Sequence, residues 1–198
     1  MRDPFNIMVA GVGGQGNLVC GRVLAEAAVL SGFRPVVGDT FGASRRGGSV
    51  LTHLRIGKTD WAPLIPKGEV DILLGLEPLE ALRAASKFAG ARTIAIVSQT
   101  KIPTVASTGI ITEYPSLERI FESLNKLCKQ VIILDAEETL AQIGSMRMLN
   151  SYILGAMGAL EKNPLSLDVI REALQSIFGS ESANIAAFDE GIKATRLC

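Results

Sequence analysis

Short runs of apolar residues alternate with longer amphipathic stretches along the first two thirds of the chain. The runs are rich in Val, Ile and Leu and have the length of β-strands, which predicts strands at residues 5–10, 35–38, 50–56, 71–76, 93–97 and 131–134. The stretches between them predict helices at residues 14–31, 78–88 and 116–128. Alternation of strand and helix is typical of α/β proteins, so we predict a three-layer, Rossmann-like fold with a mostly parallel sheet.

The first predicted helix has a single apolar face. Gly16, Cys20, Val23, Ala27 and Leu30 recur at intervals of three and four residues, which places them on one side of a helix. We therefore expect this side to pack against the sheet.

The last third of the chain changes character and is helical in pattern from about residue 136. The segment "NSYILGAMGALEKN", residues 150–163, is apolar nearly all round and dense in Gly and Ala. Such a helix is buried on more than one side, either by its own sheet or by a partner chain. A small hairpin is predicted at residues 104–114, and we expect one domain over residues 1–198.

Composition narrows the function classes. Twenty acidic and twenty basic residues cancel, which favours neither nucleic acid nor an anionic membrane as a partner. Cys20, Cys128 and Cys198 form no cluster, and an iron–sulfur cluster usually needs four thiolates, so we expect no metal site on this chain. Scattered, reduced cysteines are typical of a cytoplasmic protein. The apolar runs are too short for a membrane helix, and the first predicted strand begins so near residue 1 that we expect no signal peptide.

A glycine-rich segment joins the first strand to the first helix. Its sequence, Gly11-Val12-Gly13-Gly14-Gln15-Gly16, fits G-x-G-x-x-G, in which bare backbone approaches a phosphate at a helix N-terminus. Asp39 stands near the end of the second strand, where a ribose-binding carboxylate would lie. Three interpretations stay open: a dinucleotide such as NAD or FAD, another phosphorylated ligand, or close packing alone.

A second unusual segment follows the second strand. In "DTFGASRRGGSV", Arg45 and Arg46 precede the bare backbone of Gly47 and Gly48. Arginine beside flexible glycine predicts an anion-binding or partner-binding loop, with a solvated surface loop as the alternative.

Three further residues have weaker signals. Glu77 follows a strand and begins a helix, so it either faces the crevice at the carboxyl end of the sheet or only stabilises the helix start. His53 is the only histidine, and a structural role on its strand is the better interpretation. Asn150 could cap its own helix or meet the first glycine segment.

The combined motifs resemble a known family. "GVGGQG", "FGASRRGGSV", "HLRIG" and "PLIPKGEVDILLGLEPLEALR", with "MLNSYILGA" at residues 148–156, are similar to the gamma subunit of 2-oxoacid:ferredoxin oxidoreductases. Within that group they most resemble the small (beta) subunit of indolepyruvate:ferredoxin oxidoreductase. The resemblance departs at Phe41, where His is frequent, and at Arg45, where Gln is frequent, so the 2-oxoacid could be an aryl pyruvate or another member of the class.

The resemblance implies a role within a larger enzyme. Such enzymes decarboxylate a 2-oxoacid oxidatively, with coenzyme A as acyl acceptor and ferredoxin as electron acceptor. Thiamine diphosphate, magnesium and [4Fe-4S] clusters are expected on a larger partner subunit, and no cofactor or catalytic residue on this chain. The implied role of this chain is to complete the active site and bind coenzyme A through Gly11, Gly13, Gly14, Gln15, Gly16, Arg46, Gly47, Gly48 and Glu77.

Two other function classes stay open at this stage. The chain could be a free-standing NAD(P)-binding protein or regulator that uses residues 11–16 and Asp39, or an assembly scaffold whose glycines only pack helix on sheet. Whether the isolated chain forms a homodimer is also open.

Overall fold

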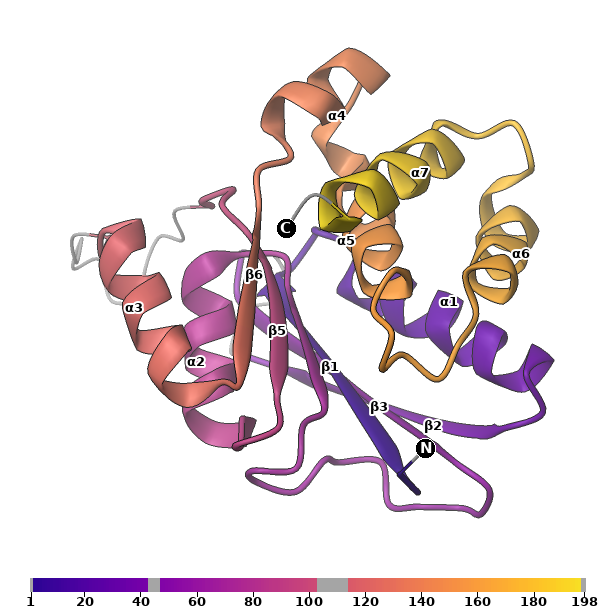
Figure 1. The fold of residues 1–198 in the computed structure, drawn as a ribbon, viewed down its shortest axis with the longest axis horizontal. Helices are drawn as coiled ribbons and strands as arrows, with labels where there is room; N and C mark the ends of the chain where they lie inside the picture. The colour runs from indigo at the N-terminus through magenta and orange to yellow at the C-terminus, as the bar shows by residue number, and fades with distance from the viewer. Residues whose placement is uncertain (1, 43–46, 103–113, 197–198) are drawn as a thin grey trace.

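The computed structural model describes residues 2–42, 47–102 and 114–196. Figure 1 shows a central sheet with helices on both of its faces. The strands are β1 (Phe5–Val12), β2 (Arg34–Phe41), β3 (Ser49–Gly57), β4 (Ile72–Gly75), β5 (Ile94–Ser98) and β6 (Gln130–Leu134). The helices are α1 (Asn17–Leu30), α2 (Pro78–Phe88), α3 (Leu117–Leu127), α4 (Glu137–Ile143), the 3₁₀ turn η1 (Met146–Met148), α5 (Leu149–Gly158), α6 (Leu167–Phe178) and α7 (Ala183–Arg196). The predicted hairpin lies outside the described residues, apart from its last residue.

The six strands form one mixed sheet in the order β2-β3-β1-β4-β5-β6. Strands β1, β4, β5 and β6 are parallel, as predicted, whereas β3 runs antiparallel to both β1 and β2. A short connection joins β2 to β3, and a chain that turns back over so few residues pairs antiparallel. The fold therefore differs from a simple dinucleotide-binding fold, because β3 separates β2 from β1.

The sheet has a hydrophobic core on each of its faces, and alternating side chains of β1 contribute to both. Ile7 and Val9 face a layer built from α1, α5, α6 and α7, whereas Met8 and Ala10 face α2 and α3. Every residue of β1 is buried, as expected for a strand covered on both faces. The three-layer prediction is therefore confirmed (Figure 1).

Helix α1 starts later than predicted. Gly14 and Gly16 have φ angles of +108° and +91°, which a right-handed helix does not contain, so the helix begins at Asn17. Cys20 is buried as its spacing predicts, but Leu30 is 48% exposed, since it belongs to the last turn of the helix. The predicted apolar face is therefore correct except at that end.

The helical C-terminal third is confirmed, and its apolar helix is buried within the chain itself. Helices α5 and α7 pack so closely that a methyl group on Gly155 would lie 2.0 Å from the carbonyl oxygen of Phe188. On the opposite helix, a methyl group on Gly191 would lie 1.9 Å from the carbonyl oxygen of Tyr152. Helix α5 ends at Gly158, earlier than the predicted 163. Over the described residues, no helix is long and apolar enough to cross a membrane.

Candidate functional site

The loop between β1 and α1 leaves a helix N-terminus without a side-chain cap. Gly16 is the N-cap residue of α1 and offers no side chain to the first turn. Within the described part of the chain, no group accepts the backbone N–H of Gly16, Asn17, Leu18 or Val19. Unpaired N–H groups and the positive end of the helix dipole make this loop suited to an anion.

The structure brings the two predicted glycine segments together. The N–H of Gly13 donates to the carbonyl oxygen of Gly48 over 2.8 Å, and the N–H of Gly47 donates back to the carbonyl oxygen of Gly13 over 3.4 Å. Arg46 lies outside the described residues, immediately before Gly47. The second glycine segment is therefore anchored at the edge of the first, and the N–H of Gly13 is used inside the protein.

Gln15 holds the first glycine loop in place. Its Oε1 accepts the N–H of Val12 over 2.7 Å, and its Nε2 donates to the carbonyl oxygen of Leu76 over 2.9 Å. Both ends of the Gln15 amide are thus engaged with the backbone of β1 and of the residue that follows β4. These contacts give Gln15 a structural role that its place in the glycine motif did not reveal.

Gly11 is bare because its neighbours pack over it. A methyl group there would lie 2.8 Å from Oε1 of Gln15 and 2.9 Å from Oδ1 of Asn17. Gly14 differs, since no atom of the described residues would lie within 4 Å of a methyl at that position. Packing therefore explains Gly11, whereas Gly14 is required by its positive φ angle.

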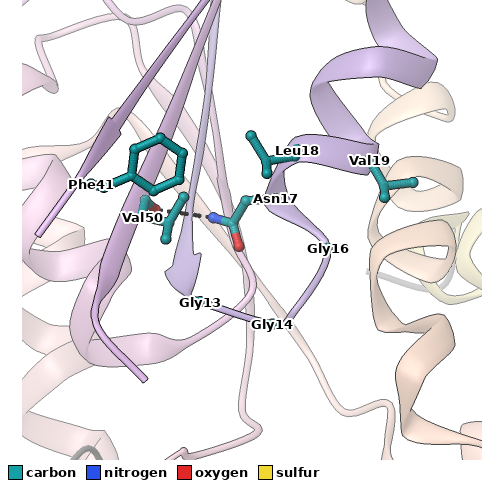
Figure 2. A pocket seen from close by; sticks show the side chains of 8 residues that line it. All are labelled: Gly13, Gly14, Gly16, Asn17, Leu18, Val19, Phe41 and Val50. Atoms are coloured by element: carbon teal, nitrogen blue, oxygen red, sulfur yellow. Dashed lines mark hydrogen bonds between the residues drawn. The ribbon is translucent and has the colours of Figure 1, made fainter. Parts of the chain in front are cut away.

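A cleft opens beside the loop. Its volume is about 250 Å³, and its lining residues are Gly13, Gly14, Gly16, Asn17, Leu18, Val19, Phe41 and Val50. Figure 2 shows Phe41 and Val50 on one side and the first residues of α1 on the other. Phe41 and Leu18 are half exposed, with 48% and 50% of their surface accessible. The sequence motifs indicated the glycines of this cleft but not its apolar walls, which come from separate elements.

Asp39 does not stand where a ribose-binding carboxylate would. It lies on β2, which β3 separates from β1 and the glycine loop. Its Oδ1 accepts a hydrogen bond from the hydroxyl of Thr52 over 2.6 Å. In a dinucleotide-binding fold the acidic residue ends the strand that follows the first helix and is free to bind the ribose. The NAD(P) alternative therefore has no geometric support from Asp39.

Glu77 begins α2 and has both carboxylate oxygens occupied. One oxygen, Oε2, accepts the N–H of Glu80 over 2.8 Å, and the other accepts the hydroxyl of Tyr114. Glu77 is 1% exposed. Burial, followed by the Glu77 carboxylate, raises the pKa of Tyr114, so its hydroxyl stays protonated and continues to donate. Of the two interpretations of Glu77, the structure thus shows the helix-start role.

The remaining candidates are structural. Nδ1 of the buried His53 accepts the N–H of Ile65 over 3.2 Å, and burial lowers the pKa of this histidine. Burial raises the pKa of Cys20 to about 12, so its thiol is not a ready nucleophile.

Asn150 lies against the first glycine loop, which agrees with one of its two interpretations. A methyl group on Gly16 would lie 2.8 Å from Nδ2 of Asn150. Among the residues described, no group of three His, Cys, Asp or Glu could hold a metal ion.

Fold and site together define a three-layer α/β protein with an uncapped helix N-terminus at the carboxyl edge of its sheet. Residues 6–194 match the pyruvate ferredoxin/flavodoxin oxidoreductase family, and the chain belongs to that family. It is 37% identical to indolepyruvate oxidoreductase subunit IorB of Archaeoglobus fulgidus, over 91% of this chain and 89% of that protein. It is 31% identical to the common gamma subunit of the pyruvate/ketoisovalerate oxidoreductases of Pyrococcus furiosus, over 86% of this chain and 85% of that protein.

Solved structures share the fold. Pyruvate oxidoreductase subunit PORC of Thermotoga maritima superposes with a TM-score of 0.70 at 21% identity, over 97% of each chain. The 2-oxoglutarate:ferredoxin oxidoreductase of Magnetococcus marinus gives a TM-score of 0.70 at 19% identity, over all of this chain but 32% of that one. The expectation of a small subunit of an oxoacid oxidoreductase is confirmed, and the comparisons do not support a free-standing NAD(P)-binding protein.

Proposed function

We propose that this subunit completes the coenzyme A site of a 2-oxoacid:ferredoxin oxidoreductase. The observation that carries the proposal is the uncapped start of α1, where the backbone N–H groups of residues 16–19 follow a glycine loop and have no acceptor among the described residues. Coenzyme A is rich in phosphate, and phosphate is the ligand that such a helix start binds best. The Magnetococcus marinus enzyme, whose fold is similar, has been solved with coenzyme A and succinyl-CoA bound.

The two glycine segments would share the phosphates. Among the described residues the N–H groups of residues 16–19 have no acceptor, and Gly47 is bonded to Gly13 at the edge of the loop. Arg46 precedes Gly47 in the sequence and is the arginine that we propose to bind the phosphates with it. The two hydrogen bonds of Gln15 hold the loop in place, which lowers the conformational cost of binding a ligand there. Each charge-assisted hydrogen bond to phosphate contributes about 1.5–3 kcal/mol.

A larger partner subunit would supply the redox chemistry. Thiamine diphosphate with magnesium and [4Fe-4S] clusters, which we expect on that subunit, would supply the chemistry of decarboxylation and of electron transfer to ferredoxin. Cys20 and Cys128 are buried and lie in different cores, so this chain's described thiols are not placed to hold a cluster. Its own contribution is to bind and orient coenzyme A and to close the cleft against water.

An aryl 2-oxoacid is the substrate class we favour. Relatives between 30% and 37% identical over nearly the whole chain are named as subunits of indolepyruvate oxidoreductases. Relatives of the pyruvate/ketoisovalerate enzymes are 27–31% identical. Steady-state rates of the reconstituted complex with indolepyruvate and with pyruvate decide between the two classes, and a higher kcat/KM for pyruvate would refute the aryl assignment.

The role in coenzyme A binding is tested by reconstitution with the large subunit. Arg46→Ala should raise the KM for coenzyme A at least tenfold, which corresponds to the loss of one charge-assisted hydrogen bond. Arg34→Ala is the matched control, since Arg34 is an exposed arginine of β2 whose carboxylate partner, Asp60, is exposed as well. Full turnover by the large subunit alone, or an unchanged KM in the Arg46 variant, would show that the proposed role is wrong.

A further inference from the structure

Exposed apolar side chains gather at one edge of the sheet. Ten large apolar residues are exposed in the described part of the chain, and six of them lie on the edge strand β2, on the outer side of α1 or in the segment that joins β3 to β4. These six residues, which we call the β2-edge surface, are Leu18, Val29, Val37, Phe41, Trp61 and Leu64. Figure 1 shows β2 at the edge of the sheet with α1 beside it. Gathered apolar residues on a surface mark a site of protein interaction.

The outer side of α1 is apolar along its whole length. Residues at intervals of three and four lie on this side, namely Leu18, Arg22, Ala25 and Val29. The sides next to it are covered, since Gly21 lies against β2, where its methyl group would be 3.6 Å from Val37, and α6 packs along α1 as well. Arg22 is exposed and forms no salt bridge with any described residue. This side therefore presents aliphatic side chains around one unpaired positive charge.

The segment between β3 and β4 is held in place on the other face of the sheet. Arg55 donates from Nη1 to a carbonyl oxygen of this segment over 2.9 Å, and its Cζ lies 5.2 Å from the centre of the Trp61 ring. Pro63 packs on β2 so closely that a methyl group on Gly38 would lie 2.9 Å from its Cβ. An apolar segment that is already ordered loses little entropy on binding, and Trp is enriched among the residues that dominate binding energy.

The β2-edge surface is long enough for a stable interface. Helix α1 has 14 residues and β2 has 8. At 1.5 Å per helical residue and 3.4 Å per strand residue, they extend over about 21 Å and about 27 Å. A standard interface buries about 800 Å² of each partner, which corresponds to about 28 Å in each direction. The surface therefore has the length of an interface between two proteins.

Two features indicate which protein covers this surface. Pro35 has no N–H to donate, and Arg34 and Asp39 place charges on β2. Such residues prevent an edge strand from pairing with another strand, which disfavours a second copy of this chain joined through β2. The surface also continues into the cleft at the glycine loop, since Leu18 and Phe41 belong to both.

We propose that the β2-edge surface docks the larger, 2-oxoacid-activating subunit, through an apolar face that carries a carboxylate opposite Arg22. This inference rests on the proposed function, because coenzyme A held in the cleft reacts with the acyl group only where the larger subunit lies beside Leu18 and Phe41. An unpaired arginine within an apolar face sets the register of docking once the partner supplies the opposite charge. Val29 and Leu64 would then be covered on opposite faces of the sheet edge.

Sedimentation velocity of the full chain mixed with the larger subunit measures their Kd and tests the proposal. Val29→Lys and Leu64→Lys should each raise this Kd at least tenfold, because each would bury an ammonium group against an apolar face. Val29 is 60% exposed and Leu64 is 53% exposed, so neither change should lower the Tm of the isolated chain. The matched control is Leu127→Lys, which also replaces an exposed apolar residue in the last turn of a helix, and its Kd should equal that of the wild type.

The outcomes separate this inference from the proposed function. An unchanged Kd in either variant overturns the docking surface. So does a result in which both variants separate copies of the isolated chain but bind the larger subunit normally, because the surface would then belong to a second copy. A raised Kd in both variants, combined with an unchanged KM for coenzyme A in Arg46→Ala, supports the docking surface and refutes the proposed role in coenzyme A binding.

Discussion

Replacing Gln15 by alanine tests whether this residue stabilises the glycine loop or contacts a ligand. The substitution removes the hydrogen bond from Val12 N–H and the hydrogen bond to the Leu76 carbonyl oxygen. Val12 is 2% exposed and Leu76 is fully buried, so water replaces those bonds poorly. At about 1 kcal/mol net for each bond, Gln15→Ala should lower the free energy of unfolding by about 2 kcal/mol. For a chain of this size, that loss lowers Tm by about 4–8 °C.

Thermal unfolding followed by circular dichroism measures this shift, with Gln99→Ala as the control. Gln99 follows β5, at the same edge of the sheet, and its side chain is exposed. An exposed substitution of this kind changes stability by less than about 0.5 kcal/mol. Equal Tm values for the two variants, combined with weaker coenzyme A binding in Gln15→Ala alone, would refute the structural tie and make Gln15 a ligand contact.

Three further predictions concern stability. Gly155→Ala should destabilise the protein by about 3 kcal/mol or prevent folding, since its methyl would overlap a backbone carbonyl of α7, and chemical denaturation measures the loss. Tyr114→Phe leaves one oxygen of buried Glu77 without its donor and should cost about 1–3 kcal/mol in the same assay. Burial lowers the pKa of His53 below its ordinary 6.5, so the unfolded chain binds the proton more readily. Stability should therefore fall as pH drops from 7 to 5, and His53→Gln, which can still accept from Ile65, should flatten that dependence in urea titrations at each pH.

Most elements of the fold follow from local pattern. Helix α2 has the predicted bounds because Glu77 caps it and Pro78 begins it, both of which are local signals. The start of α1 was predicted too early, because periodicity does not register the positive φ angles of Gly14 and Gly16. The direction of β3 was not predicted either, since strand pairing depends on contacts between distant residues that a hydrophobic run does not encode.

The candidate site divides in the same way. The glycine motif predicted the loop and its free helix start, because φ preferences and helix termini are local properties. The same motif did not indicate that Gln15 reaches Leu76 or that Phe41 faces Leu18, since each pair joins different elements. Coenzyme A binding by Arg46 and Glu77 stays a prediction. Its binding by Gly11, Gly13, Gly14, Gln15, Gly16, Gly47 and Gly48 stays a proposal.

By itself the sequence determined the order of strands and helices, the glycine turn at residues 11–16 and the family to which the chain belongs. These features depend on residue type and spacing within short segments, and such local patterns do not depend on tertiary contacts. Only the tertiary structure decided that β3 lies between β1 and β2, which separates Asp39 from the glycine loop. It also decided that the Asn17 amide donates to the Val50 carbonyl oxygen while its own oxygen has no partner among the described residues, because that depends on which backbone groups packing brings within reach.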